Sequence, residues 1–313
     1  MTASDTSFAN RPVVSAGATD LFASDLAARF KLLRLPDQID PEAEILVSQF
    51  AKVDRTLLDQ LPKLKAIVST WAGFDNIDLN LVRERGIMLA NAQGAFDICC
   101  ADLSMGLLIS AVRRITAADR HVRAGKWPTA RFPMTRRVSG RRMGIYGMGG
   151  IGGEIAKRGL GFEMEIGYHN RRRQPDVPYR YFEDLKSLAE WADYLMIACP
   201  LTEATRGSVN REVLTALGAE GCLVNIARGA IVDEPVMLEM LESGALGSAG
   251  LDVFADEPHV PEGFFKLDNA VIVPHVGGVT EDSHVDSRMG AIRNVEAFFK
   301  TGKLATPVDL TRV

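Results

Sequence analysis

Short apolar runs alternate with helical patterns along nearly the whole of this 313-residue chain. The apolar runs are rich in β-branched residues, as in Ile45–Ser48, and residues with helical spacing separate them, as in Leu79–Arg85. Parallel strands need a crossover between them, usually a helix, so the alternation predicts βαβ units and mostly parallel sheets. A chain of this length exceeds one ordinary hydrophobic core, which predicts two α/β domains.

Two longer helical segments indicate where the chain passes between these domains. Phe96–Val122 is expected to leave the first domain and pack on the second, and a helix near Glu281–Lys300 is expected to return to the first. We therefore predict a discontinuous domain of residues 1–96 and 283–313, and a continuous one of residues 97–282. The expected strands are Val13–Ala16, Ile45–Ser48, Ala66–Thr70, Ile87–Asn91, Met143–Tyr146, Glu165–Tyr168, Tyr194–Ala198, Leu223–Ile226, Ala249–Val253 and Val271–Val273.

The composition restricts the kinds of partner. A formal net charge of -4 argues against a general nucleic-acid or anionic-membrane surface. No run approaches the roughly 18 to 20 apolar residues of a membrane span, and no signal peptide is visible, so we expect a cytoplasmic protein. The cysteines form no CxxC pair, and no Cys/His cluster suggests a metal site. They are Cys99, Cys100, Cys199 and Cys222.

A glycine-rich turn follows the expected strand Met143–Tyr146 and precedes a helical pattern at Ile151–Leu160. In that setting a G-x-G-x-x-G turn binds the pyrophosphate of a dinucleotide at the helix N-terminus. The alternative is a glycine turn that binds no ligand. The residues of the motif are Gly147, Met148, Gly149, Gly150, Ile151 and Gly152.

The end of the next strand bears on which dinucleotide is bound. An NAD site places an acid about 20 residues after the glycines, to bind the ribose 2′-hydroxyl. Here Asn170, Arg171 and Arg172 stand instead, and guanidinium groups can bind a 2′-phosphate. We expect NADPH to be preferred, with NADH also usable, unless the turn is simply solvated.

Three later strands lead into residues capable of catalysis, which are Arg228, Glu257 and His275. In an open α/β sheet, ligands bind beyond the carboxyl ends of the strands, so these residues could share one crevice. Hydride addition to a 2-keto acid leaves negative charge on oxygen, and a histidine suits the proton donation that follows. A carboxylate would orient that ring, and an arginine would hold the substrate carboxylate. A structural ion pair with an ordinary histidine is the alternative.

Taken together, these motifs resemble the D-isomer-specific 2-hydroxyacid dehydrogenase family from about residue 40 onward. Among its members, NADPH-dependent glyoxylate/hydroxypyruvate reductases and plant-type hydroxyphenylpyruvate reductases look most similar. The resemblance rests on the motifs Gly73–Asp78, Gly147–Gly152, Cys199–Thr202, Asn225–Gly229, Leu251–Phe254, Glu257–Pro258 and Pro274–His275.

The resemblance implies two doubly wound parallel-sheet domains, a Rossmann nucleotide domain at 97–282 and a flavodoxin-like substrate domain. It implies catalysis by Arg228, Glu257 and His275, and a homodimer that pairs through the nucleotide domains. Ala72 and Gly73 would bind the substrate carboxylate, together with Arg228 and His275. Other residues expected to contact the dinucleotide are Cys199, Pro200, Ile226, Ala227 and Asp252.

The predicted activity is reduction of a small 2-keto acid, such as glyoxylate or hydroxypyruvate, to the D-2-hydroxy acid. Two alternatives stay open. One is an NAD-linked dehydrogenase that works in the oxidative direction, and the other is a dinucleotide-sensing binding protein similar to the corepressors of this superfamily. Trp71 stands where a smaller residue is expected before Ala72, and it could alter the pocket wall or merely pack inside the protein.

Overall fold

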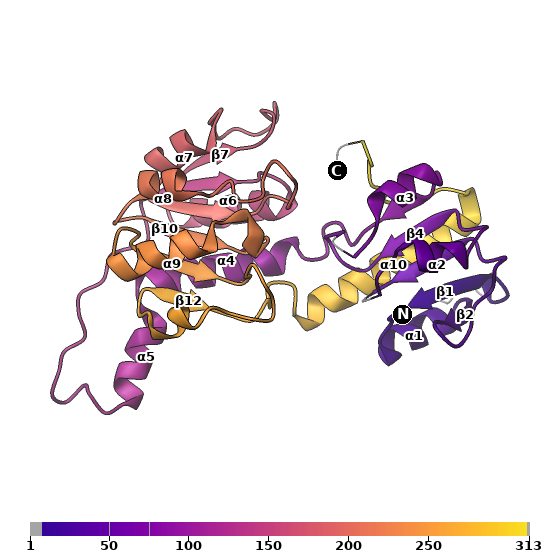
Figure 1. Ribbon diagram of the computed structural model, residues 1–313, viewed down its shortest axis with the longest axis horizontal. Helices are drawn as coiled ribbons and strands as arrows, with labels where there is room; N and C mark the ends of the chain where they lie inside the picture. The colour runs from indigo at the N-terminus through magenta and orange to yellow at the C-terminus, as the bar shows by residue number, and fades with distance from the viewer. Residues whose placement is uncertain (1–7, 50, 75, 312–313) are drawn as a thin grey trace. The chain divides into compact units, whose positions relative to one another are not determined.

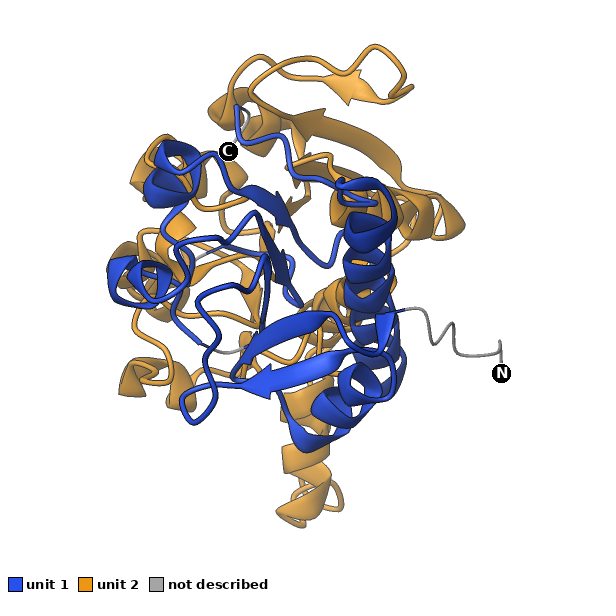
Figure 2. Ribbon diagram, turned by 90° about the vertical axis from the view of Figure 1, so that its right-hand side faces the viewer, with its two compact units in different colours: residues 1–96, 281–313 blue, residues 97–280 orange. Residues whose placement is uncertain are grey.

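The computed structural model describes residues 8–49, 51–74 and 76–311, and it divides into two compact units (Figure 2). Unit 1 consists of residues 1–96 and 281–313, and unit 2 of residues 97–280. The chain therefore returns to unit 1 at Glu281, two residues before the predicted boundary at residue 283. Asp75, part of the motif Gly73–Asp78, lies outside the described residues. No described helix has the length and apolar character needed to cross a membrane.

Unit 1 is built on a sheet of five strands within the described residues, in the order β2-β1-β3-β4-β5 with every pair parallel. Helices α1 and α10 pack on one face, and α2 and α3 pack on the other. This order is that of flavodoxin-like folds, which confirms the predicted fold of this unit. The elements are β1 (Pro12–Ala16), α1 (Asp20–Ala27), β2 (Lys31–Arg34), β3 (Ile45–Ser48), α2 (Arg55–Asp59), β4 (Ala66–Ser69), α3 (Leu79–Glu84), β5 (Met88–Ala90) and α10 (Glu281–Thr301).

Unit 2 contains a parallel sheet of seven strands among the described residues, in the order β12-β11-β10-β9-β6-β7-β8 (Figure 1). It begins with α4 (Asp97–Val112) and α5 (Ile115–Arg123). The order turns back at β6, which is the topological switch point of a Rossmann fold and confirms that prediction. The strands are β6 (Arg142–Tyr146), β7 (Glu165–His169), β8 (Arg180–Tyr181), β9 (Tyr194–Ile197), β10 (Cys222–Asn225), β11 (Ser248–Leu251) and β12 (Ala270–Ile272).

The helices of unit 2 cover both faces of its sheet. Helices α4 and α6 enclose one apolar core, and α7, α8 and α9 enclose the other. The strands between them are buried along almost their whole length, as expected for a parallel sheet covered on both faces. These helices are α6 (Gly150–Gly161), α7 (Leu185–Trp191), α8 (Arg211–Leu217) and α9 (Glu234–Ser243).

The predicted helical segment Phe96–Val122 is helical over almost its whole length and packs on unit 2, but it forms two helices, α4 and α5, and not one. The chain breaks between α4 and α5, where Arg114 adopts a left-handed backbone with φ +49°. Arginine rarely occupies that region, so the residue types around it give no sign of the break. After α5, residues 124–141 form the long irregular segment beside α5 in Figure 1.

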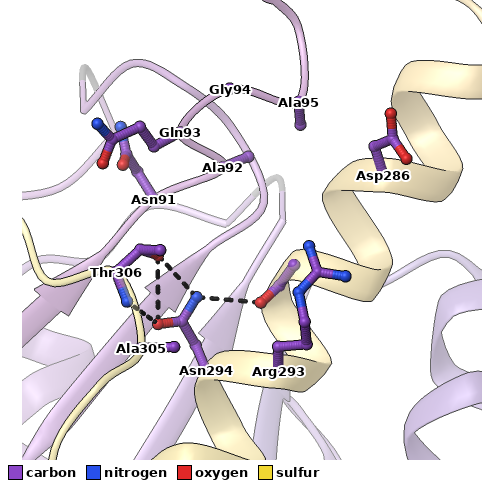
Figure 3. Close-up of a pocket in the computed structure, with 11 residues that line it drawn as sticks. Asn91, Ala92, Gln93, Gly94, Ala95, Asp286, Arg293, Asn294, Ala305 and Thr306 are labelled. Atoms are coloured by element: carbon purple, nitrogen blue, oxygen red, sulfur yellow. Dashed lines mark hydrogen bonds between the residues drawn. The ribbon is translucent and has the colours of Figure 1, made fainter.

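Asn294 fastens the C-terminal segment of unit 1 to α10. The side chain is 3% exposed, and its Nδ2 donates to Gly290 O and to Thr306 Oγ1, both at 3.0 Å (Figure 3). Its Oδ1 accepts a hydrogen bond from Thr306 N at 3.0 Å. These bonds close one side of a polar cavity of about 220 Å³ that also contacts residues 91–95 and Arg293. None of the predicted site residues lines this cavity.

Asn294→Ala is expected to lower the free energy of unfolding by about 2–3 kcal/mol, because it leaves buried polar groups without partners. Arg293→Ala alters the adjacent but exposed position of the same helix and should change stability by less than about 0.5 kcal/mol. Urea unfolding of both variants measures the difference. Equal losses in the two variants would contradict this account of Asn294.

Candidate functional site

The glycine turn after β6 has the geometry of a dinucleotide-binding loop. Gly147 has φ +106°, and a Cβ atom built there would lie 2.4 Å from Cys199 N. A Cβ on Gly152 would lie 2.1 Å from Gly147 O, so helix α6 packs directly on the turn. Around Gly149 nothing lies within 4 Å of a built Cβ. The turn thus leaves open space at Gly149, before the N-terminus of α6, which is where a Rossmann fold binds a pyrophosphate.

Two polar side chains that follow β7, those of Asn170 and Gln174, bind the backbone of the glycine turn. Met148 N donates to Asn170 Oδ1 at 2.7 Å, and Gln174 Nε2 donates to Met148 O at 2.7 Å. Asn170 is therefore engaged with the loop backbone, which keeps the end of β7 next to the turn. Arg171 and Arg172 follow on the surface, and both are exposed.

The residues after β9 and β10 border the same edge of the sheet. Cys199, Ile226 and Ala227 are buried, whereas Pro200 is exposed. Burial raises the pKa of the Cys199 thiol to about 12, so the neutral form persists and no nucleophilic thiolate forms. The contribution of these residues to dinucleotide binding stays a prediction.

His275 and Glu257 form a hydrogen-bonded pair beyond the carboxyl ends of β12 and β11. His275 Nδ1 lies 2.7 Å from Glu257 Oε2, and the second carboxylate oxygen, Oε1, accepts from Phe254 N at 3.0 Å. An ionised carboxylate is only an acceptor, so Nδ1 carries the proton and Nε2 faces away from the pair. The His275 side chain is 47% exposed, which leaves the ring accessible to a small molecule.

A buried carboxylate fixes the turn that carries His275. Asp252 is 1% exposed, and its oxygens accept from Val276 N at 2.6 Å and from Gly277 N at 2.9 Å. Burial raises the pKa of the Asp252 carboxyl, while these N–H groups act in the opposite direction. His275 itself has φ +53°, and such left-handed strain in a residue other than glycine is typical of functional sites.

Arg228 belongs to a turn that contacts the Glu257 loop directly. A Cβ on the next residue, Gly229, would lie 1.9 Å from the carbonyl carbon of Phe254. Phe254 in turn donates its N–H to Glu257. Contacts therefore run without a break from the Arg228 turn through Phe254 to Glu257 and His275.

An apolar cavity of about 250 Å³ adjoins this pair. It gives the imidazole and the carboxylate surroundings with few competing polar groups, in which electrostatic interactions are stronger than in water. The lining residues are Phe254, Glu257, Pro258, Val260, Ile272, Val273, Pro274 and His275.

Ala72 and Gly73 follow β4 in unit 1, so they belong to a different unit from the residues above. Ala72 O accepts a hydrogen bond from Asn91 Nδ2 at 2.7 Å. Trp71 stacks on Phe96 with 5.6 Å between ring centroids, so its indole packs within unit 1. The roles of Ala72 and Gly73 toward a substrate stay predictions.

Several residues that shape the site were not singled out from the sequence. Asn225 is 1% exposed and holds the Arg228 turn, because its Nδ2 donates to Arg228 O and its Oδ1 accepts from Ala227 N. Glu234 accepts from Ala255 N at 3.0 Å, and burial raises the pKa of its carboxyl. Gln174 was likewise missed. Glu234 and Gln174 bind backbone groups more than 20 positions away, so no local pattern reveals them.

Comparison with known proteins identifies the family of the chain. Residues 105–277, inside unit 2, match the family model described as D-isomer specific 2-hydroxyacid dehydrogenase, NAD binding domain. The chain is 41% identical over 297 residues to glyoxylate/hydroxypyruvate reductase A of Arabidopsis thaliana, covering 91% of this chain and 94% of that protein. It is 40% identical to hydroxyphenylpyruvate reductase of Plectranthus scutellarioides, with the same coverage.

Solved structures agree with the sequence relatives. The NADPH-dependent glyoxylate/hydroxypyruvate reductase from Sinorhizobium meliloti, solved in complex with NADP and malonate, superposes with a TM-score of 0.87 at 30% identity. The match covers 96% of this chain and 97% of that one. A 2-hydroxyacid dehydrogenase from Ketogulonicigenium vulgare gives a TM-score of 0.86 at 32% identity, over 95% and 98% of the two chains. The chain thus belongs to the D-isomer-specific 2-hydroxyacid dehydrogenase family, and its unit 2 contains the family's nicotinamide-dinucleotide-binding domain.

Proposed function

We propose that this protein uses NADPH to reduce a small 2-keto acid, such as glyoxylate or hydroxypyruvate, to the D-2-hydroxy acid. The observation that carries the proposal is the hydrogen-bonded pair His275–Glu257 beside the Arg228 turn, on the sheet that belongs to the dinucleotide-binding domain. Relatives at 40–42% identity carry the names of glyoxylate/hydroxypyruvate or hydroxyphenylpyruvate reductases, which favours the reductive direction. In this proposal unit 1 is the substrate domain, with Ala72 and Gly73 at the substrate carboxylate.

The proposed chemistry divides between cofactor and protein. The nicotinamide, when bound, supplies the hydride that adds to the keto carbon. His275 Nε2 then gives its proton to the keto oxygen, so that the C=O bond becomes CH–OH. Glu257 holds Nδ1 and stabilises the positive charge of the ring before the transfer. Arg228 orients the substrate carboxylate and polarises the keto oxygen with its fork of N–H donors.

The preference for NADPH is proposed from Arg171 and Arg172. Both are exposed at the end of β7, where a Rossmann fold presents the ribose 2′ position, and no acid stands there. The S. meliloti relative is described as NADPH-dependent. Asn170, bonded to Met148 N, is expected to contact the same ribose.

We also propose a homodimer that pairs through the nucleotide domains, because the surface of unit 2 offers apolar side chains near α5. Trp127 is 68% exposed, and Met134 on the same irregular segment is also exposed. Analytical ultracentrifugation should give twice the mass of one chain, and a monomer at micromolar concentration would contradict the proposal.

The free cysteines of the described residues also fit the reducing cytoplasm expected from the sequence.

The main test is a panel of keto acids assayed by loss of absorbance at about 340 nm, the band of the reduced nicotinamide. We expect turnover of glyoxylate, hydroxypyruvate or an arylpyruvate, with a kcat/KM for NADPH about 10- to 100-fold above that for NADH. Turnover of no keto acid with either cofactor would overturn the proposal in favour of a dinucleotide-sensing protein. Higher activity with NAD and hydroxy acids would favour the oxidative alternative.

The double variant Arg171→Ala/Arg172→Ala tests the cofactor preference within the same assay. Loss of the charge-assisted bonds should lower kcat/KM for NADPH about 10- to 100-fold and leave the value for NADH nearly unchanged. Arg173→Ala, the next exposed position, serves as the control. Parallel losses with both cofactors would contradict the assignment.

A further inference from the structure

A carboxylate lies directly against the start of the helix that follows the glycine turn. A Cβ atom built on Gly150, the first residue of α6, would be 2.0 Å from Asp97 Oδ2 and 2.7 Å from Asp97 Cγ. The N-cap residue of this helix is Gly149, which has no side chain to cap the free N–H groups. Asp97 therefore lies where a helix attracts negative charge through its first N–H groups and its dipole.

The other acids near this position are neutralised, whereas Asp97 is not. Arg158 of α6 pairs with Glu154 on the same helix and with Asp102 of α4, both at 2.6 Å. Lys157 also lies 3.7 Å from Glu154. Within the described part of the chain, the half-buried Asp97 carboxylate has neither a hydrogen bond nor an ion pair. The remaining titratable neighbours on α4 are Cys99 and Cys100, and burial raises the pKa of the Cys100 thiol to about 12, so that thiol stays neutral.

Both the carboxylate and a bound pyrophosphate are attracted to the same helix end. The pyrophosphate of a dinucleotide carries two negative charges and uses the N-terminus of α6 in this fold. We infer that Asp97 is an affinity-determining residue of the dinucleotide site, whose negative charge weakens cofactor binding until the side chain is protonated or moves aside. The inference rests on the dinucleotide-binding domain and not on the proposed keto-acid substrate. Its test measures cofactor binding and not turnover.

The direction of the pH effect follows from the charge. Burial, followed by the charge of Glu154, raises the pKa of the Asp97 carboxyl. Protonated Asp97 leaves the helix end to the pyrophosphate, and ionised Asp97 opposes it, so affinity should fall as pH rises through the titration of this group. NADH is the suitable probe, because it lacks the 2′-phosphate, which itself titrates near neutral pH.

Asp97→Asn removes the charge and keeps the shape of the side chain. We expect it to bind both NADH and NADPH about three- to tenfold more tightly than the wild type at pH 7.5, as measured by nicotinamide fluorescence titration. The gain should be similar for the two cofactors, because they share the pyrophosphate. Glu242→Gln removes an exposed charge on α9 and should leave both Kd values unchanged.

Two results would overturn the inference. One is equal or weaker dinucleotide binding by Asp97→Asn, which would mean that the carboxylate is neutral toward the cofactor or helps to bind it. The other is a wild-type Kd for NADH that does not rise as the pH is raised from about 4, near the ordinary pKa of an Asp carboxyl, to about 7.5, and this test needs no variant. Loss of turnover with unchanged binding would instead count against the proposed keto-acid reduction.

Discussion

Direct contact between backbone segments organises the carboxyl edge of the sheet in unit 2. Gly147 lies against the backbone of Cys199, Gly152 lies against the carbonyl of Gly147, and Gly229 lies against the backbone of Phe254. A side chain at any of these positions would push two loops apart. Because of these contacts, the turn after β6 lies against the residue that follows β9, and the turn after β10 lies against the residues that follow β11. The β11 loop in turn carries Glu257, which is hydrogen-bonded to His275.

The parallel arrangement of the sheet explains why residues at the ends of strands could be identified from the sequence. In a parallel sheet the carboxyl ends share one edge, so a residue that follows a strand has a known approximate position. The pairing of Glu257 with His275 agrees with that expectation. The supporting residue Glu234 could not be inferred in this way, because it binds a backbone group 21 positions away, at a place set by tertiary packing. Asn225 was not singled out either, although its bonds stay within its own turn.

The fold shows a similar division between what local patterns reveal and what they do not. The fully buried strands β3 and β9 were located within one residue. Edge strands β2 and β8 were missed, since β2 is only half-buried and β8 has two residues. The break at Arg114 was missed because a left-handed arginine leaves no mark in the residue types.

Charge is distributed unevenly around the proposed cofactor site, and this has a consequence for cofactor choice. In the two proposals above, the negative charge of Asp97 opposes the pyrophosphate that NADH and NADPH share, whereas Arg171 and Arg172 attract the 2′-phosphate that only NADPH carries. NADPH would then regain, through its 2′-phosphate, the binding free energy that both cofactors lose at the pyrophosphate, whereas NADH would not. A weaker pyrophosphate site would thus make tight binding depend more on the two arginines, with their own contacts unchanged.

In the proposed reaction His275, held through Nδ1 by Glu257, donates the proton. The most direct measurement compares kcat and the Kd for NADPH in the wild type, His275→Asn and His259→Asn. His259 is an exposed histidine outside the pair and serves as the matched control. We expect kcat of His275→Asn to fall by about 10²- to 10⁴-fold with a nearly unchanged Kd, and His259→Asn to behave as the wild type. A His275→Asn enzyme that keeps more than about a tenth of the wild-type kcat would contradict this role of His275.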